Sequence, residues 1–202
     1  MTKLVAITGG IGSGKSTFSK QILRRKLKLL DSDQQVDQIY TKPNNDFVKY
    51  LRKIGLEKSI KAKNKVDKKY ISKIIFINKD IRHKLQNYIF KIVRKKRTEF
   101  IESQKKRGEK VIFFDIPLLL ENNLAKDYDL VISIISAKKN RYKRLRLSKK
   151  LSIFDFNNII KAQTTDLDRR KYSDIVIINN NSKYEYIKKI NRVLDRILLW
   201  EK

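Results

Sequence analysis

Residues 9–16 read Gly9-Gly10-Ile11-Gly12-Ser13-Gly14-Lys15-Ser16, which satisfies the phosphate-binding pattern G-x-x-x-x-G-K-[ST]. Residues 3–8 before it form a short apolar run that predicts a buried parallel strand, and residues 17–26 after it follow helical spacing. This pattern is informative when a strand precedes it and a helix follows it. The sequence therefore predicts a P-loop, a turn that holds the phosphates of a nucleotide.

The residue types of this loop suit a triphosphate with a magnesium ion. Gly12 and Gly14 can adopt backbone conformations closed to other residues, so that successive N–H groups turn inward around a phosphate. Lys15 is placed to reach the β- and γ-phosphates, and the Ser16 hydroxyl to bind Mg²⁺. These two residues disfavour a Rossmann dinucleotide site and leave an ordinary glycine-rich turn as the simpler alternative. We expect ATP and Mg²⁺ as cofactors, with the nucleotide contacted by Gly12, Ser13, Gly14, Lys15, Ser16 and Thr17.

The rest of the chain predicts a layered α/β fold. Further apolar runs that read as strands are residues 27–30, 111–114, 130–135 and 175–178, and an amphipathic helix begins near Tyr184. Helical apolar spacing dominates residues 34–107, apart from the basic stretch 57–69, which we expect to be a solvated loop or a frayed turn. The predicted fold class is therefore a P-loop NTPase, a parallel sheet flanked by helices with a helical insertion.

Acidic residues follow three of these runs. Asp31 and Asp33 come after the second predicted strand, and Asp115 after the third. In open α/β sheets the ligand lies beyond the carboxyl ends of the strands, so these carboxylates are well placed for chemistry. We assign Asp33 as the base that accepts the proton of a phosphoryl acceptor, with a helix cap as the alternative role. Asp115 follows an apolar strand as a Walker B residue does, so we assign it to Mg²⁺, with a structural hydrogen bond to the P-loop as the alternative.

The segment Asp115-Ile116-Pro117-Leu118-Leu119-Leu120-Glu121 stays apolar beyond the end of its strand and passes through a proline. A strand end normally turns polar. The segment could form an apolar wall against the acceptor substrate, or could pack beneath the helical insertion.

Composition restricts the setting and the partners. The chain of 202 residues has no cysteine, so disulfides and thiolate chemistry are excluded and a reducing cytoplasm is the expected location. No signal-peptide pattern is present, and no apolar run approaches the ~20 residues needed to span a bilayer. The net charge of +28 is spread along the whole chain, as A+T-rich codons would produce, so we expect no specific nucleic-acid partner.

Taken as a set, the motifs resemble those of the dephospho-coenzyme A kinase family. The resemblance rests on the P-loop with Thr8, on Asp31-Ser32-Asp33, on the proline-bearing segment 115–121, on Ala162-Gln163 and on Ser173-Asp174-Ile175-Val176-Ile177. These occur in the family's order over nearly the whole chain. The resemblance implies transfer of the ATP γ-phosphate to the ribose 3′-hydroxyl of dephospho-CoA, the last step of coenzyme A synthesis. Separately from the resemblance, we expect a monomer.

The resemblance also implies a division of the chain and further site residues. Residues 1–33, 108–137 and 164–202 would form the nucleotide-binding core, residues 34–107 the helical substrate domain and residues 138–163 a mobile lid. Lys15, Asp33 and the lid's Arg144 would be catalytic, while Arg82, Leu118 and Glu121 would contact the acceptor. Arginine suits phosphate contacts because its planar guanidinium stays charged and donates in pairs.

The chain departs from the family pattern in and near the lid. Phe90-Lys91 replaces the usual His-Pro, Arg141 stands where a glutamine is common, and Ser148 stands where a second lid arginine is expected. Arg141 or Arg146 could supply the missing charge. Two alternatives of function remain open at this stage: another small-molecule P-loop kinase, of the shikimate or gluconate type, and a P-loop protein that binds nucleic acid under nucleotide control.

Overall fold

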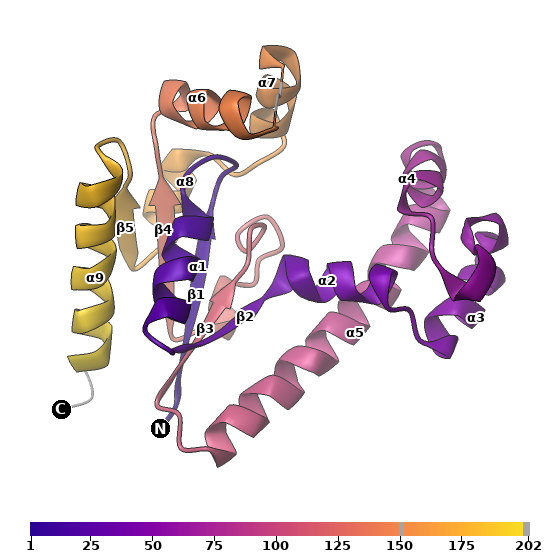
Figure 1. Ribbon diagram of the computed structural model, residues 1–202, viewed down its shortest axis with the longest axis horizontal. Helices are drawn as coiled ribbons and strands as arrows, with labels where there is room; N and C mark the ends of the chain where they lie inside the picture. The colour runs from indigo at the N-terminus through magenta and orange to yellow at the C-terminus, as the bar shows by residue number, and fades with distance from the viewer. Residues whose placement is uncertain (150–151, 200–202) are drawn as a thin grey trace. The chain divides into compact units, whose positions relative to one another are not determined.

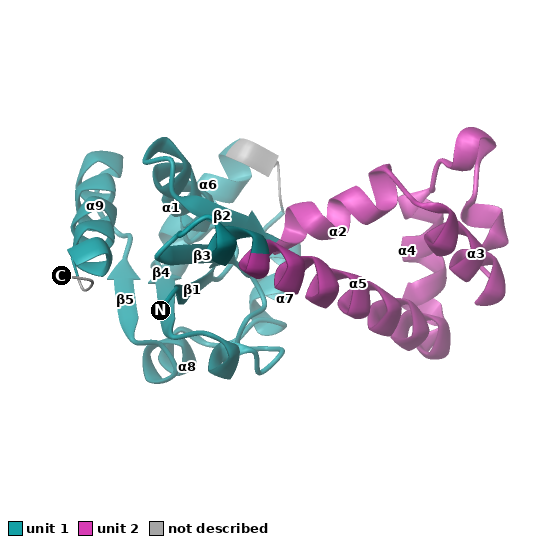
Figure 2. Cartoon of the chain, turned by 90° about the horizontal axis from the view of Figure 1, so that it is seen from below, with its two compact units in different colours: residues 1–31, 103–202 teal, residues 32–102 magenta. Residues whose placement is uncertain are grey.

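The computed structural model describes residues 1–149 and 152–199, without the side chains of Ser148 and Lys149. The chain forms two compact units, which Figure 2 shows in teal and magenta. Unit 1 consists of Met1–Asp31 and Ser103–Lys202, and unit 2 of Ser32–Glu102. The predicted substrate domain, residues 34–107, falls largely on unit 2, while its role in binding the substrate stays a prediction.

Unit 1 is built on a parallel sheet of five strands in the order β2-β3-β1-β4-β5 (Figure 1). The strands are β1 (Lys3–Gly9), β2 (Lys28–Asp31), β3 (Val111–Asp115), β4 (Leu130–Ile135) and β5 (Ile175–Ile178). Each corresponds to a predicted apolar run, since strands buried on both faces read as continuous apolar segments. The predicted class, a parallel sheet flanked by helices, is confirmed.

Two helices cover one face of this sheet. The first, α1 (Lys15–Arg24), packs with the last, α9 (Lys183–Leu199), over the strands. The apolar core between them includes Phe18 and Ile22 from α1 and Ile190 and Leu194 from α9. The other helical segments of unit 1 are η3 (Ala125–Asp127), α6 (Lys138–Lys149), α7 (Ile153–Lys161) and α8 (Asp166–Lys171). The predicted lid, residues 138–163, comprises α6, α7 and residues 150–151, which lie outside the described part.

Unit 2 is helical and has a core of its own. Its elements are α2 (Ser32–Thr41), α3 (Asn45–Lys53), η1 (Glu57–Ser59), η2 (Ala62–Asn64), α4 (Lys68–Ile77) and α5 (Lys79–Lys106), of which α5 runs on into unit 1. Phe47, Leu51, Ile71 and Leu85 are fully buried together in this core. The stretch 57–69 contains the short 3₁₀ turns η1 and η2, as the expected loop or frayed turn allows, and in addition an antiparallel bridge between Ile60 and Val66 and the start of α4.

The helices give no sign of a membrane span. In the ranges 1–149 and 152–199, none combines the length and the apolar character needed to cross a bilayer.

Candidate active site

The P-loop joins β1 to α1 and depends on two glycines in left-handed conformations. Gly12 has a φ of 72° and Gly14, which caps α1, has a φ of 108°. Side chains rarely adopt such angles, so glycine is required at both positions. A Cβ atom on Gly14 would also collide with the side-chain amide of Asn179. The P-loop therefore needs glycine both for its left-handed backbone angles and for its close contact with Asn179.

The inner side of the loop offers unpaired donors. Within the described part of the chain, the backbone N–H groups of Gly12, Gly14, Lys15 and Ser16 have no acceptor, whereas that of Ser13 is bonded to Gly10 O at 3.0 Å. Unpaired N–H groups at a helix N-terminus, together with the helix dipole, form an anion site. These residues therefore fit a phosphate chain such as that of ATP.

The Lys15 and Asp115 side chains are in contact at the carboxyl end of β3. The Lys15 ammonium donates to Asp115 Oδ1, and the Ser19 hydroxyl donates to Asp115 Oδ2 at 2.5 Å. Asp115 is only 2% exposed, so its charge is held by these two partners. The structure thus brings two predicted site residues together. The Lys15–Asp115 contact also agrees with the structural alternative for Asp115, a hydrogen bond to the P-loop.

The chemistry of the donor set also fits Mg²⁺. Ser16 lies at the exposed start of α1, and hard cations such as Mg²⁺ prefer hydroxyl, carboxylate and phosphate oxygens. The described residues contain no group of three or more His, Cys, Asp or Glu side chains that could hold a metal by themselves. This is expected where nucleotide phosphates supply part of the coordination. The roles of Ser16 and Asp115 as Mg²⁺ ligands stay predictions, and both oxygens of Asp115 here accept hydrogen bonds from Lys15 and Ser19.

Arg144 lies behind the P-loop. Its guanidinium donates to Gly12 O at 3.1 Å and Ser13 O at 3.4 Å, to the Ser136 hydroxyl at 3.1 Å and to Asn179 O at 2.9 Å. Burial lowers the pKa of Arg144 below its ordinary value. The predicted lid arginine therefore holds backbone carbonyl groups of the phosphate loop, and its catalytic role stays a prediction.

Arg141 contacts the same loop nearer its start. Its Nε atom donates to Ile11 O at 2.8 Å, and its guanidinium lies so close to Gly10 that a Cβ there would collide with it. Gln163 accepts from Ile11 N at 2.9 Å and from Arg141 at 3.4 Å. Burial lowers the pKa of Arg141, while Asp166, 3.7 Å away, acts in the opposite direction. Arg141 is thus a buried part of the loop's support, whereas Arg146 is exposed.

The acceptor-side candidates in unit 1 have contrasting environments. Leu118 is exposed, as a wall against a substrate requires. Glu121 instead accepts from Thr164 N at 2.8 Å and from the fully buried Arg169 at 3.2 Å. Ile116 and Leu119 are buried, so part of the proline-bearing segment packs inside the fold. Contact of Leu118 and Glu121 with the acceptor stays a prediction.

Two further candidates belong to unit 2. Asp33 is the second residue of α2, is exposed, and follows the end of β2 by two positions. Asp31, the last residue of β2, lies opposite Asp115 in the strand register. Arg82 lies in the first turn of α5 and is half-buried. The roles of Asp33 and Arg82 stay predictions.

Sequence reasoning missed two residues that contact the phosphate loop. Asn179 follows β5 and donates to Ser13 O at 2.7 Å, and the Tyr186 hydroxyl of α9 donates to Gly14 O at 3.1 Å. The run of three asparagines after the last strand was a usable signal for the first, since polar residues at strand ends lie near ligand sites. Tyr186 gave no signal, because it occupies an apolar position of an amphipathic helix.

Comparison with known proteins shows the family of this chain. The family model for dephospho-CoA kinase matches residues 3–185. The dephospho-CoA kinase of Fusobacterium nucleatum subsp. nucleatum is 31% identical over 195 residues, which cover 96% of this chain and 98% of that protein.

Solved structures share the fold. TT1252 from Thermus thermophilus superposes with a TM-score of 0.81 at 20% identity, covering 100% of this chain and 98% of that one. A dephospho-CoA kinase from Campylobacter jejuni superposes with a TM-score of 0.76 at 24% identity, covering 100% of both chains. Because the family model spans most of the sequence and the F. nucleatum relative is matched over nearly its full length, this chain belongs to the dephospho-CoA kinase family.

Proposed function

We propose that this chain transfers the γ-phosphate of ATP to the ribose 3′-hydroxyl of dephospho-CoA, with the P-loop of unit 1 as the ATP site. Membership of the family gives the reaction. The main support for the ATP site is the set of unpaired N–H groups next to the Lys15–Asp115 ion pair. These N–H groups belong to Gly12, Gly14, Lys15 and Ser16. Both the N–H groups and the ion pair belong to unit 1.

The P-loop residues would bind and orient the phosphates. The N–H groups of the loop hold the β-phosphate, and Lys15 exchanges its bond with Asp115 for the β- and γ-phosphate oxygens. Phosphoryl transfer involves little covalent chemistry by the protein, so positioning and charge stabilisation supply most of the rate enhancement. Lys15 is therefore the main cation that this chain brings to the transferred group.

Mg²⁺ would be held by Ser16 and Asp115 together with the phosphates, and when bound it neutralises charge on them. The release of Lys15 from Asp115 leaves this carboxylate with Ser19 as its neighbour and one oxygen available. Ser16 is exposed and needs no change to take part. Both assignments are part of the proposal.

The acceptor side of the proposal rests on the resemblance. Asp33 would accept the proton of the attacking 3′-hydroxyl and orient its oxygen toward the γ-phosphate. Arg82 would pair with a phosphate of the acceptor, and Leu118 and Glu121 would line its site. Arg144, in α6 of the proposed lid, would add positive charge in the closed state.

One assay separates this function from its rivals. ADP release is measured with dephospho-CoA, shikimate, gluconate and nucleoside monophosphates side by side, at equal enzyme and ATP. We expect turnover with dephospho-CoA alone. Turnover only with shikimate or gluconate would assign the chain to another type of small-molecule kinase. Steeply salt-dependent binding of nucleic acid, with no acceptor phosphorylated, would favour the nucleic-acid alternative.

The setting of the enzyme is part of the same proposal. We propose that it acts in the cytoplasm as a monomer. Light scattering coupled to gel filtration should give the mass of one chain, 24.0 kDa.

A further inference from the structure

Three consecutive carbonyl groups of the P-loop accept hydrogen bonds from side chains, and the last of them, Gly14 O, also accepts from Thr17 N at 2.9 Å and Phe18 N at 3.3 Å as the cap of α1. Gly12 O accepts from Arg144 at 3.1 Å, Ser13 O accepts from Asn179 at 2.7 Å, and Gly14 O accepts from Tyr186 at 3.1 Å. The three donors come from α6, from the residue after β5, and from α9. Segments far apart in the sequence therefore hold the same short piece of backbone.

Because of the geometry of the peptide bond, a hydrogen bond to a P-loop carbonyl group also fixes the direction of the next N–H group. In a trans peptide the C=O of one residue and the N–H of the next point in opposite directions. A donor that holds Ser13 O outward therefore directs the N–H of Gly14 inward, and a donor on Gly14 O does the same for the N–H of Lys15. Both N–H groups belong to the unpaired set that fits a phosphate chain.

The Tyr186 hydroxyl is buried, so it can act as a permanent hydrogen-bond donor. The side chain is 3% exposed, and burial raises the pKa of its hydroxyl well above the ordinary value, while the nearby Arg144 guanidinium acts in the opposite direction. The hydroxyl therefore keeps its proton and can donate throughout the neutral range. Asn179 is also buried, and its amide oxygen accepts from Arg144 at 3.3 Å, which leaves its N–H groups to face Ser13 O.

We propose that Asn179 and Tyr186 are positioning residues for nucleotide phosphates: by holding Ser13 O and Gly14 O from outside, they keep the N–H groups of Gly14 and Lys15 directed into the phosphate site. The inference rests on the proposed function, because it takes the P-loop as the ATP site. It adds two residues that the P-loop pattern does not contain. Their loss should weaken the binding of nucleotide phosphates and leave the binding of the acceptor unchanged.

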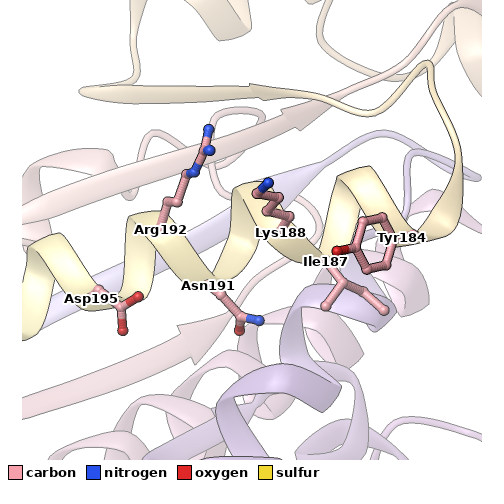
Figure 3. A pocket seen from close by; sticks show the side chains of 6 residues that line it. All are labelled: Tyr184, Ile187, Lys188, Asn191, Arg192 and Asp195. Carbon is pink, nitrogen blue, oxygen red and sulfur yellow. The ribbon is translucent and has the colours of Figure 1, made fainter.

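The chain offers a matched control on the same helix. Tyr184 is 76% exposed and lines a pocket along α9 together with Ile187, Lys188, Asn191, Arg192 and Asp195 (Figure 3). Tyr184→Phe removes the same hydroxyl group from the same helix, two residues away, where it has no contact with the P-loop. Tyr186→Phe and Tyr184→Phe therefore differ in the hydrogen bond under test.

The experiment measures ADP binding by calorimetry, which needs no acceptor, and then the KM values for ATP and dephospho-CoA. For Tyr186→Phe we expect ADP affinity to fall about three- to tenfold, the usual effect of one buried hydrogen bond. The KM for ATP should rise in parallel, with the KM for dephospho-CoA and the ADP affinity of Tyr184→Phe unchanged. A role in folding alone would lower the melting temperature without separating the two KM values.

Asn179→Ser is the second variant, since a serine hydroxyl is too short to span the distance to Ser13 O. It should show the same separation of the two KM values. Tyr186→Phe and Asn179→Ser proteins that both bind ADP as tightly as the parent protein would overturn the inference. A parent protein that binds no ADP would overturn the inference and the proposed ATP site together. ADP binding without phosphorylation of dephospho-CoA would overturn only the proposed acceptor.

Discussion

Lys15 and Asp115 form an ion pair that joins the P-loop to the carboxyl end of β3. The Asp115 side chain is almost fully buried, and its second oxygen is taken by the Ser19 hydroxyl. Removal of one partner from a buried ion pair leaves the other charge without compensation. The pair therefore keeps both groups in place until phosphates compete for the lysine.

Lys15→Ala should abolish most of the activity. The variant loses the cation that would follow the γ-phosphate, and loss of one such electrostatic group lowers kcat by roughly 10²–10³-fold. The measurement is kcat at saturating ATP and dephospho-CoA, with ADP affinity determined separately. A kcat equal to that of the parent protein would exclude Lys15 from the catalytic site.

Asp115→Asn should affect both stability and the requirement for metal. The amide keeps the shape of the side chain but leaves the Lys15 ammonium without its anion, which we expect to cost about 1–3 kcal/mol of unfolding free energy. If Asp115 also takes part in holding Mg²⁺, the concentration of Mg²⁺ needed for half-maximal activity should rise. Urea unfolding and a Mg²⁺ titration check the two parts. An unchanged Mg²⁺ requirement with reduced stability would leave Asp115 with the structural role alone.

Asp33→Asn should lower turnover while nucleotide binding survives. The amide cannot accept the proton of the acceptor hydroxyl, and loss of a general base typically costs about 10²–10⁴-fold in rate. ADP affinity should remain that of the parent protein, because Asp33 lies outside the P-loop. Asp37→Asn, one turn further along α2, is the control and should retain full turnover. Full turnover in Asp33→Asn would remove it from the catalytic role.

The sheet and the phosphate loop could be predicted because local sequence determines them. Apolar runs identify buried strands, and the glycines of the P-loop leave few alternatives for its backbone. In a parallel sheet the carboxyl ends of all strands lie at the same end of the sheet, which is why Lys15 and Asp115 could be expected near one another. A hydrogen bond between Asp115 and the P-loop was one of the two roles expected for Asp115, but the sequence could not identify Lys15 as the partner, because it does not give side-chain orientation.

The outer support of the loop was beyond sequence reasoning for the same reason. Asn179 and Tyr186 reach the P-loop across more than 160 residues of chain. Arg144 was predicted as a lid cation from its motif, and in the structure its guanidinium contacts P-loop carbonyl groups. An arginine pattern gives the charge of a side chain, whereas the fold decides which acceptors the charge meets.

Arg141 and Arg146 should differ sharply on substitution. Arg141→Ala removes a buried guanidinium that contacts Ile11 O and Gln163, so we expect ATP affinity to fall about tenfold and the melting temperature to drop. Arg146→Ala removes an exposed side chain and should leave stability unchanged. The two KM values and kcat of both variants are compared. If both proteins keep full turnover, neither arginine compensates for the missing lid charge.

Ionisation of the Tyr40 hydroxyl should lower the stability of unit 2 at alkaline pH. Its ring packs edge-on against Phe47, with centroids 5.5 Å apart, and burial raises the pKa of its hydroxyl to about 12. The folded pKa lies above the ordinary value of 10.0, so the folded state resists ionisation. The associated stability is fully present below pH ~10 and is lost as the pH rises toward ~12, by up to about 2 kcal/mol after allowance for partial exposure.

Tyr40→Phe should remove this part of the pH dependence. Phenylalanine keeps the ring in the core and has no proton to lose, so the variant should lose less stability than the parent protein between pH ~10 and ~12. Urea unfolding of both proteins across this range gives the difference directly. The remaining tyrosines and lysines, including Lys68 above the Tyr40 ring, are present in both proteins and affect them similarly. Equal losses of stability in the two proteins would show that Tyr40 ionises as readily in the folded state as in the unfolded chain.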